Sequence, residues 1–195
     1  MTKSILISGV GGQGTLLASR ILGAVAIGRG FDVKVSEVHG MSQRGGSVLT
    51  YVKYSDIAVY SPIIDEGRAD YLLAFELLEA YRSLKYLKPG GKMLTSRQQI
   101  NPMPVITGAE TYPPSIEEQI ANLGVDITAL DALQPALEAG SAKTVNVVLL
   151  GALSGFLGFS EAEWRNAIQA TVKPQFAEIN RKAFEAGRAS VINIL

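Results

Sequence analysis

The stretch ILISGVGGQGTLLA, residues 5–18, decides the fold. Four β-favouring residues lead into a glycine cluster, and an apolar run with helical character follows it. A glycine at the end of a strand permits positive φ, so the backbone can turn sharply into a helix there. The segment therefore predicts a buried strand, a glycine loop and a helix, as at the start of an α/β sheet.

The rest of the chain continues this alternation. We expect strands at 31–38, 47–54, 69–77, 92–96 and 125–132, and helices at 15–30, 77–87, 115–124, 161–172 and 175–187. The second and third strands are joined by a short loop without helical pattern, which favours an antiparallel pair within a mainly parallel mixed sheet. The prediction is a three-layer αβα single domain over residues 1–195, with only helices after residue 143.

Local signals predict several boundaries. The turn KPGGK at 88–92 ends a helix, and the prolines of INPMPVITG at 100–108 suggest a loop feeding a short edge strand. Capping-box spacing occurs at Ser115 with Glu118 and at Ser160 with Glu163. The terminal SVINIL at 190–195 is a last strand or a partner contact.

The apolar run at 144–160 is shorter than the roughly 20 residues that span a bilayer, so it predicts a buried helix. Gly151 and Gly155 form a G-x-x-x-G pair that suits close packing through small residues. A helix that is apolar on every side has to be covered by the core or by another subunit.

Composition excludes several functions. The 195 residues carry 18 basic and 18 acidic side chains, which gives no sign of binding to nucleic acid or to a membrane. The chain has no cysteine and a single histidine, so it offers no thiol chemistry, no cysteine-ligated cluster and no His-rich metal site. We expect no bound metal, and the absence of a leader-like segment makes the cytoplasm the expected location.

The glycine loop has a chemical interpretation. Gly9, Gly11 and Gly14 fit the G-x-G-x-x-G dinucleotide fingerprint, and the following helix would offer unpaired N–H groups to a phosphate or carboxylate. Such a Rossmann-like loop favours an anion or a nucleotide-like ligand. An NAD enzyme also needs an acid near the end of the second strand, where Glu37 stands. Alternatively, the glycines only permit tight packing of strand and helix.

The stretch SEVHGMSQRGGSV, residues 36–48, follows the second strand. A loop there emerges at the carboxyl edge of the sheet, beside the glycine loop. Gly45 and Gly46 suggest a tight turn, and Arg44 provides a planar fork of donors for a phosphate or for an acidic group of a partner. The other interpretation is a solvated arginine in an open loop.

Four motifs in this order, GVGGQG, SEVHGMSQRGGSV, SDIAVYSPII and NVVLLGAL, resemble the gamma-type domain of the 2-oxoacid:ferredoxin oxidoreductases over residues 3–185. The HGMSQRGG variant is most similar to the small (beta) subunits of the indolepyruvate type. The resemblance implies oxidative decarboxylation of a 2-oxoacid to an acyl-CoA, with electrons passed to ferredoxin. It also implies that thiamine diphosphate and iron–sulfur clusters reside on a large (alpha) subunit.

In this superfamily the gamma-type domain is associated with coenzyme A binding. The positions that match its two loops and its late helix are Gly9, Gly11, Gly12, Gln13, Gly14, Arg44, Gly45, Gly46 and Asn146. His39 and Met41 belong to the indolepyruvate-like variant, without an assigned role, and no catalytic residue is assigned to this chain. The isolated chain is expected to be inactive and free to form a homodimer. The alternatives are an autonomous NAD-dependent dehydrogenase and a structural adaptor that binds no ligand.

Overall fold

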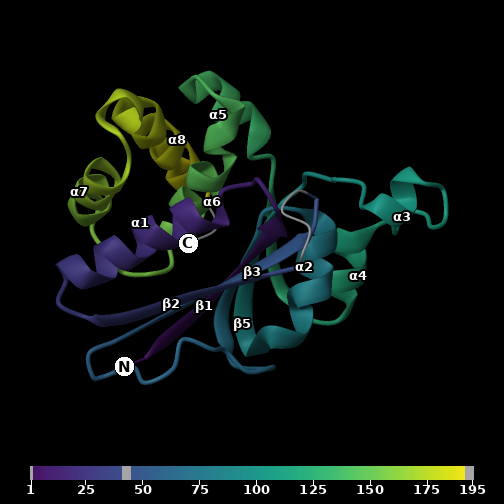
Figure 1. Ribbon diagram of the computed structural model, residues 1–195, viewed down its shortest axis with the longest axis horizontal. Helices are drawn as coiled ribbons and strands as arrows, with labels where there is room; N and C mark the ends of the chain where they lie inside the picture. The colour runs from purple at the N-terminus through teal and green to yellow at the C-terminus, as the bar shows by residue number, and fades with distance from the viewer. Residues whose placement is uncertain (1, 41–44, 192–195) are drawn as a thin grey trace.

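The computed structural model describes residues 2–40 and 45–191. Its centre is a six-stranded sheet with the strand order β2-β3-β1-β4-β5-β6 (Figure 1). The strands are β1 Lys3–Val10, β2 Asp32–His39, β3 Ser47–Ser55, β4 Ala69–Ala74, β5 Leu87–Ser96 and β6 Asp126–Leu130. Strands β1, β4, β5 and β6 run parallel, and β3 runs antiparallel to both β1 and β2. This confirms the predicted antiparallel pair in a mixed sheet.

Helices cover both faces of the sheet, because each face is apolar. One face carries α1 Thr15–Gly28, α5 Leu133–Ala139, α6 Val145–Ser154, α7 Glu161–Thr171 and α8 Ala177–Ala189. The other face carries α2 Leu77–Ser83 and α4 Ile116–Asn122. Short 3₁₀ turns occur at Leu84–Tyr86, Ala142–Thr144 and Pro174–Phe176. The α/β fold with a mainly parallel mixed sheet is confirmed, as is the helical character of residues 142–189.

Helix α6 is the centre of the larger core. Every residue from Asn146 to Ser154 is buried within this chain. Its contact with α8 depends on two glycines, because a Cβ at Gly151 would lie 2.1 Å from the carbonyl oxygen of Phe184, and one at Gly187 would lie 1.8 Å from that of Val148. The core therefore covers this helix. No helix within residues 2–40 and 45–191 is long and apolar enough to cross a membrane.

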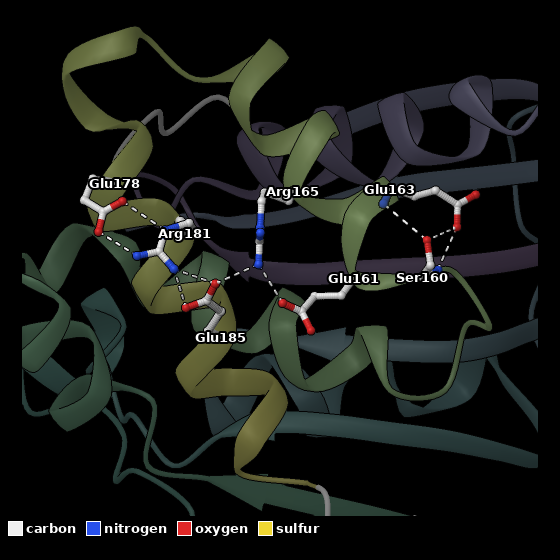
Figure 2. A network of polar contacts seen from close by, with 7 residues as sticks. All are labelled: Ser160, Glu161, Glu163, Arg165, Glu178, Arg181 and Glu185. Carbon is white, nitrogen blue, oxygen red and sulfur yellow. Dashed lines mark hydrogen bonds and ion pairs between the residues drawn. The ribbon is translucent and has the colours of Figure 1, made fainter.

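Helices α7 and α8 are joined by an ionic network on the surface (Figure 2). Arg165 pairs with Glu161 at 2.8 Å on its own helix and with Glu185 of α8 at 3.6 Å. Arg181 of α8 also binds Glu185, at 2.6 Å. At the start of α7, Ser160 and Glu163 form the predicted capping box.

Four expectations need correction. Residues 103–106 form the short helix α3 (Met103–Ile106) and not an edge strand, because Pro102 and Pro104 have a φ that suits the first turn of a helix. Ser115 makes no capping hydrogen bond, since its φ of 50° turns it into the left-handed region. Helix α5 lies at 133–139, where no helix was expected.

The fourth correction concerns residues 88–92. They lie within β5 and do not form a separate turn, and α2 ends at Ser83, earlier than expected. Their pairing with β4 is irregular, because Ala69 lies opposite Leu87 while Tyr71 lies opposite Lys92. The Pro-Gly-Gly sequence is therefore accommodated as an irregularity in the strand. Residues 192–195 of the terminal SVINIL lie outside the described part of the chain.

Candidate functional site

A cavity of about 370 Å³ opens at the carboxyl end of β1, between α1, β2 and β3. It is lined by Gly11, Gly12, Gly14, Thr15, Leu16, Glu37, His39 and Val48. The glycine loop forms one wall and the end of β2 forms the other. The cavity therefore lies where the sequence predicts a ligand.

The two loops that the sequence singles out are in direct contact. The amide of Gly11 donates a hydrogen bond to the carbonyl oxygen of Gly46 at 2.9 Å. Gly45 has a φ of 76°, which suits the predicted tight turn before β3. Arg44 and Met41 lie outside the described residues, and Arg44 directly precedes this turn in the chain.

The glycine-loop wall carries backbone donors. Gly12 and Gly14 have φ values of 102° and 82°, and the carbonyl oxygen of Gly14 accepts the amides of Leu17 and Ala18 at 3.1 and 3.2 Å. The amides of Thr15 and Leu16 have no acceptor in the described part of the chain. Unpaired amides at the positive end of a helix dipole attract an anion.

The opposite wall carries a carboxylate. Glu37 Oε2 accepts hydrogen bonds from the hydroxyls of Thr15 and Thr50, both at 3.1 Å. Thr50 is fully buried, and its polar side chain interrupts the apolar alternation of the third strand. His39 is exposed, and its Nδ1 lies 3.0 Å from the carbonyl oxygen of Gly40. The cavity thus places donors for an anion opposite an acceptor for hydroxyl groups.

Gln13 does not line the cavity. Its Oε1 accepts the amide of Val10 at 2.7 Å, while its Nε2 donates to the carbonyl oxygen of Phe75 at 3.0 Å and to Oε1 of Gln98 at 3.2 Å. The side chain therefore ties the glycine loop to the ends of β4 and β5. Sequence reasoning placed it correctly in the loop but did not reveal these partners.

Gly9 and Asn146 also lie outside the cavity lining. A Cβ at Gly9 would lie 2.9 Å from Gln13 Oε1 and 3.3 Å from Phe75 Cβ, so this glycine permits close packing. Asn146, at the start of α6, donates from Nδ2 to the carbonyl oxygen of Gly14 at 3.0 Å. It holds the glycine loop against the late helix, 132 residues away in the chain.

The sheet differs from a dinucleotide-binding arrangement. In that fold the acid-bearing second strand lies next to the first and parallel to it. Here β3 lies between β1 and β2 and runs antiparallel to both. Within the described residues, no group of three or more His, Asp or Glu side chains is arranged to hold a metal ion.

Two buried carboxylates lie beside the glycine loop, and no sequence pattern indicated them. Glu79 accepts Arg82 Nη1 at 2.7 Å and also the hydroxyl of Ser47, the residue after the glycine turn. Glu76 accepts the amide of Glu79 at 2.9 Å and the hydroxyl of Tyr112. Burial, with a smaller contribution from the hydrogen bond to Glu76, raises the pKa of Tyr112 well above its usual value.

The chain is similar to known proteins over nearly its whole length. Residues 4–190 match the family described as pyruvate ferredoxin/flavodoxin oxidoreductase. The indolepyruvate oxidoreductase subunit IorB of Thermococcus kodakarensis is 45% identical over 189 residues, which cover 94% of this chain and 93% of the relative. The same subunit of Pyrococcus horikoshii is 44% identical over 190 residues, with coverage of 94% and 93%.

Solved structures share the fold of this chain. The gamma subunit of the keto/oxoacid ferredoxin oxidoreductase from Geobacter sulfurreducens has a TM-score of 0.73 and 27% identity, and the match covers 98% of this chain and 99% of that one. The 2-oxoglutarate:ferredoxin oxidoreductase of Magnetococcus marinus has a TM-score of 0.74 at 22% identity, and all of this chain matches 31% of that longer chain. The chain therefore belongs to the pyruvate ferredoxin/flavodoxin oxidoreductase family.

Proposed function

We propose that this chain is the small subunit of a 2-oxoacid:ferredoxin oxidoreductase of the indolepyruvate type. The supporting observation is the 45% identity to a small subunit of that name over 93% of its length. We further propose that residues 1–195 form one gamma-type domain, in agreement with the family match over residues 4–190. The assembled enzyme would oxidatively decarboxylate an aryl 2-oxoacid with coenzyme A, releasing CO2 and an acyl-CoA, and would pass the electrons to ferredoxin in the cytoplasm.

The chemistry of this reaction would reside on a partner. The family resemblance assigns the thiamine diphosphate chemistry to the large subunit, and the iron–sulfur clusters are assigned to it too, because this sequence has no cysteine to bind them. The isolated small chain should therefore purify colourless and fail to reduce viologen dyes with indolepyruvate. Adding the large subunit should bring activity, whereas dye reduction by the pure small chain would refute this division of labour.

We propose that the cavity beside the glycine loop takes part of coenzyme A. Coenzyme A carries phosphates that suit the amides of Thr15 and Leu16, and a ribose 2′-hydroxyl that could donate to Glu37 on the facing wall. Arg44, two residues before the turn at Gly46, would add a charge-assisted contact to the anion. Gln13 and Asn146 would act by holding the loop in place.

A dinucleotide is the second candidate for the same cavity. The observation that favours it is Glu37, which lines the cavity and follows the glycine loop at about the 20-residue spacing of the ribose-binding acid in a dinucleotide fold. Binding of coenzyme A and of NADH to the isolated chain, measured by calorimetry, separates the two. Saturable binding of NADH without binding of coenzyme A would replace the first candidate by the second.

Substitution of Arg44 in the assembled enzyme tests the coenzyme A proposal more sharply than ligand binding to the isolated chain does. Arg44→Ala should weaken coenzyme A binding by about 10- to 150-fold, because a hydrogen bond to a charged group contributes about 1.5–3 kcal/mol. Arg44→Lys should recover only part, since a single ammonium cannot make a two-pronged contact. Arg68→Ala is the matched control, because Arg68 is exposed and outside this cavity lining.

Two measurements, the KM for coenzyme A and the affinity between the subunits, distinguish the possible roles of Arg44. A higher KM for coenzyme A with normal assembly places Arg44 at the ligand, and a loss of assembly alone places it at the subunit interface. Gly11→Val should act in the same direction as Arg44→Ala, by blocking the approach of the anion. If both variants leave KM and subunit affinity within twofold of the parent, the two loops form no site, and the adaptor without ligand becomes the better description.

A further inference from the structure

Residues 98–114 form a projection, which we call the α3 arm. The segment leaves the sheet after β5, and in Figure 1 its short helix α3 lies at the right, away from the helices that cover the sheet. The side chains of Met103 and Ile106 on this helix are both 64% exposed. Helix α3 therefore presents two large apolar side chains to the surroundings, whereas Tyr112 at the root of the arm packs against the smaller core.

The root of the arm is held by buried polar contacts. Glu76 is 1% exposed and accepts the amide of Ile100 at 3.0 Å and the hydroxyl of Tyr112, one on each side of the arm. The amide of Leu77 donates to the carbonyl oxygen of Gln98 at 3.0 Å. Because a buried carboxylate joins both ends, the arm leaves the body in a defined direction.

The tip is also held in one conformation by its own hydrogen bonds. The carbonyl oxygen of Pro102 accepts the amides of Val105 and Ile106 at 2.9 and 3.0 Å. That of Pro104 accepts the amides of Ala109 and Glu110 at 2.9 and 3.0 Å. A preorganised tip loses little conformational entropy when it binds, which is the property expected of a docking element.

The low charge of the arm indicates what kind of surface it would bind. Between residues 98 and 114 the only charged side chain is Glu110. An apolar tip with a single charge fits an uncharged, apolar recess on another protein.

We propose that the α3 arm docks into an apolar recess of the large subunit, which rests on the small-subunit function proposed above. The arm's root supports this choice of partner, because Gln98 Oε1 accepts Gln13 Nε2 at 3.2 Å, beside the glycine loop. The arm follows the carboxyl end of β5, and the cavity opens at the carboxyl end of the parallel strand β1, so both lie at the same edge of the sheet. The large subunit, which would bear the reacting groups, is the chain that has to reach that edge.

The experiment measures affinity between the purified small chain and the purified large subunit of the same oxidoreductase. The double variant Met103→Ser/Ile106→Ser should weaken binding about 30-fold or more, as expected when buried anchor residues of an interface are truncated. Ile27→Ser is the matched control, because Ile27 is 63% exposed but lies on α1. It should bind within twofold of the parent.

Each other outcome counts against the arm. If the double variant binds the large subunit as tightly as the parent does, docking of the arm is refuted. An equal loss of affinity in Ile27→Ser also refutes it, because the effect would then not be specific to the arm. If the isolated parent chain sediments as a dimer and only that dimer is lost in the double variant, the occupant is a second copy of this chain. A parent chain that does not bind the large subunit at all refutes the proposed function, and the arm proposal with it. Thermal melts confirm that the variants are folded.

Discussion

Replacing Gly187 by alanine tests the contact between α6 and α8. A Cβ at this position would lie 1.8 Å from the carbonyl oxygen of Val148, whereas ordinary contacts begin at 3.4 Å, so the two backbones would have to separate by roughly 1.6 Å. Overpacking of this kind costs about 1–3 kcal/mol, and more where backbone is the obstacle. The higher helix propensity of alanine offsets at most about 1 kcal/mol of this cost.

We therefore expect Gly187→Ala to destabilise the protein by about 1–3 kcal/mol, which lowers Tm by roughly 2–12 °C for a chain of this size. Differential scanning calorimetry measures this. The control is Gly28→Ala, because Gly28 ends α1 with no atom within 4 Å of a Cβ. The control should be neutral or slightly stabilising. A Tm for Gly187→Ala within 1 °C of the parent would show that the helices do not meet in this way.

Three further predictions concern stability. Leu150→Ala should cost roughly 2–5 kcal/mol in chemical denaturation, because Leu150 is fully buried in this chain, and an unchanged midpoint would place it outside the core. Hydrogen bonds from Arg29 and Ser160 lower the pKa of Glu163 to about 2 from the usual 4.5. The carboxylate therefore contributes to folding stability above about pH 4.5, and this contribution is lost as the pH falls through 2. Glu163→Gln should therefore flatten the acid limb of a stability–pH profile, and a parallel profile would contradict this. Ser115→Gly should stabilise the chain by up to about 1 kcal/mol by relieving the left-handed backbone, whereas loss of a capping residue would have the opposite sign.

The site depends on contacts between distant parts of the chain. Asn146 at the start of α6 holds Gly14, and α6 in turn packs against α8 through Gly151 and Gly187. A displacement of α6 would therefore reach the glycine loop. For this reason the affinity of the Gly187→Ala variant for coenzyme A is a useful second measurement.

The local sequence pattern was enough to predict the class of fold. The strand, the glycine cluster and the helix at residues 5–18, the alternation that follows, and the capping box at Ser160 depend on side chains within a few residues of one another. The two loop motifs were also enough to indicate the family, since their residues are contiguous. These features needed no knowledge of what lies across the sheet.

Only the tertiary structure decided how the loops are used. It places β3 between β1 and β2, joins Gly11 to Gly46, and assigns Gln13 and Asn146 to holding the loop rather than lining the cavity. It also buries Glu76 at the root of an arm whose prolines suggested a strand. The physical reason is that periodicity reports which face of an element is apolar. The partner of a polar side chain depends instead on residues that the chain brings near only when it folds.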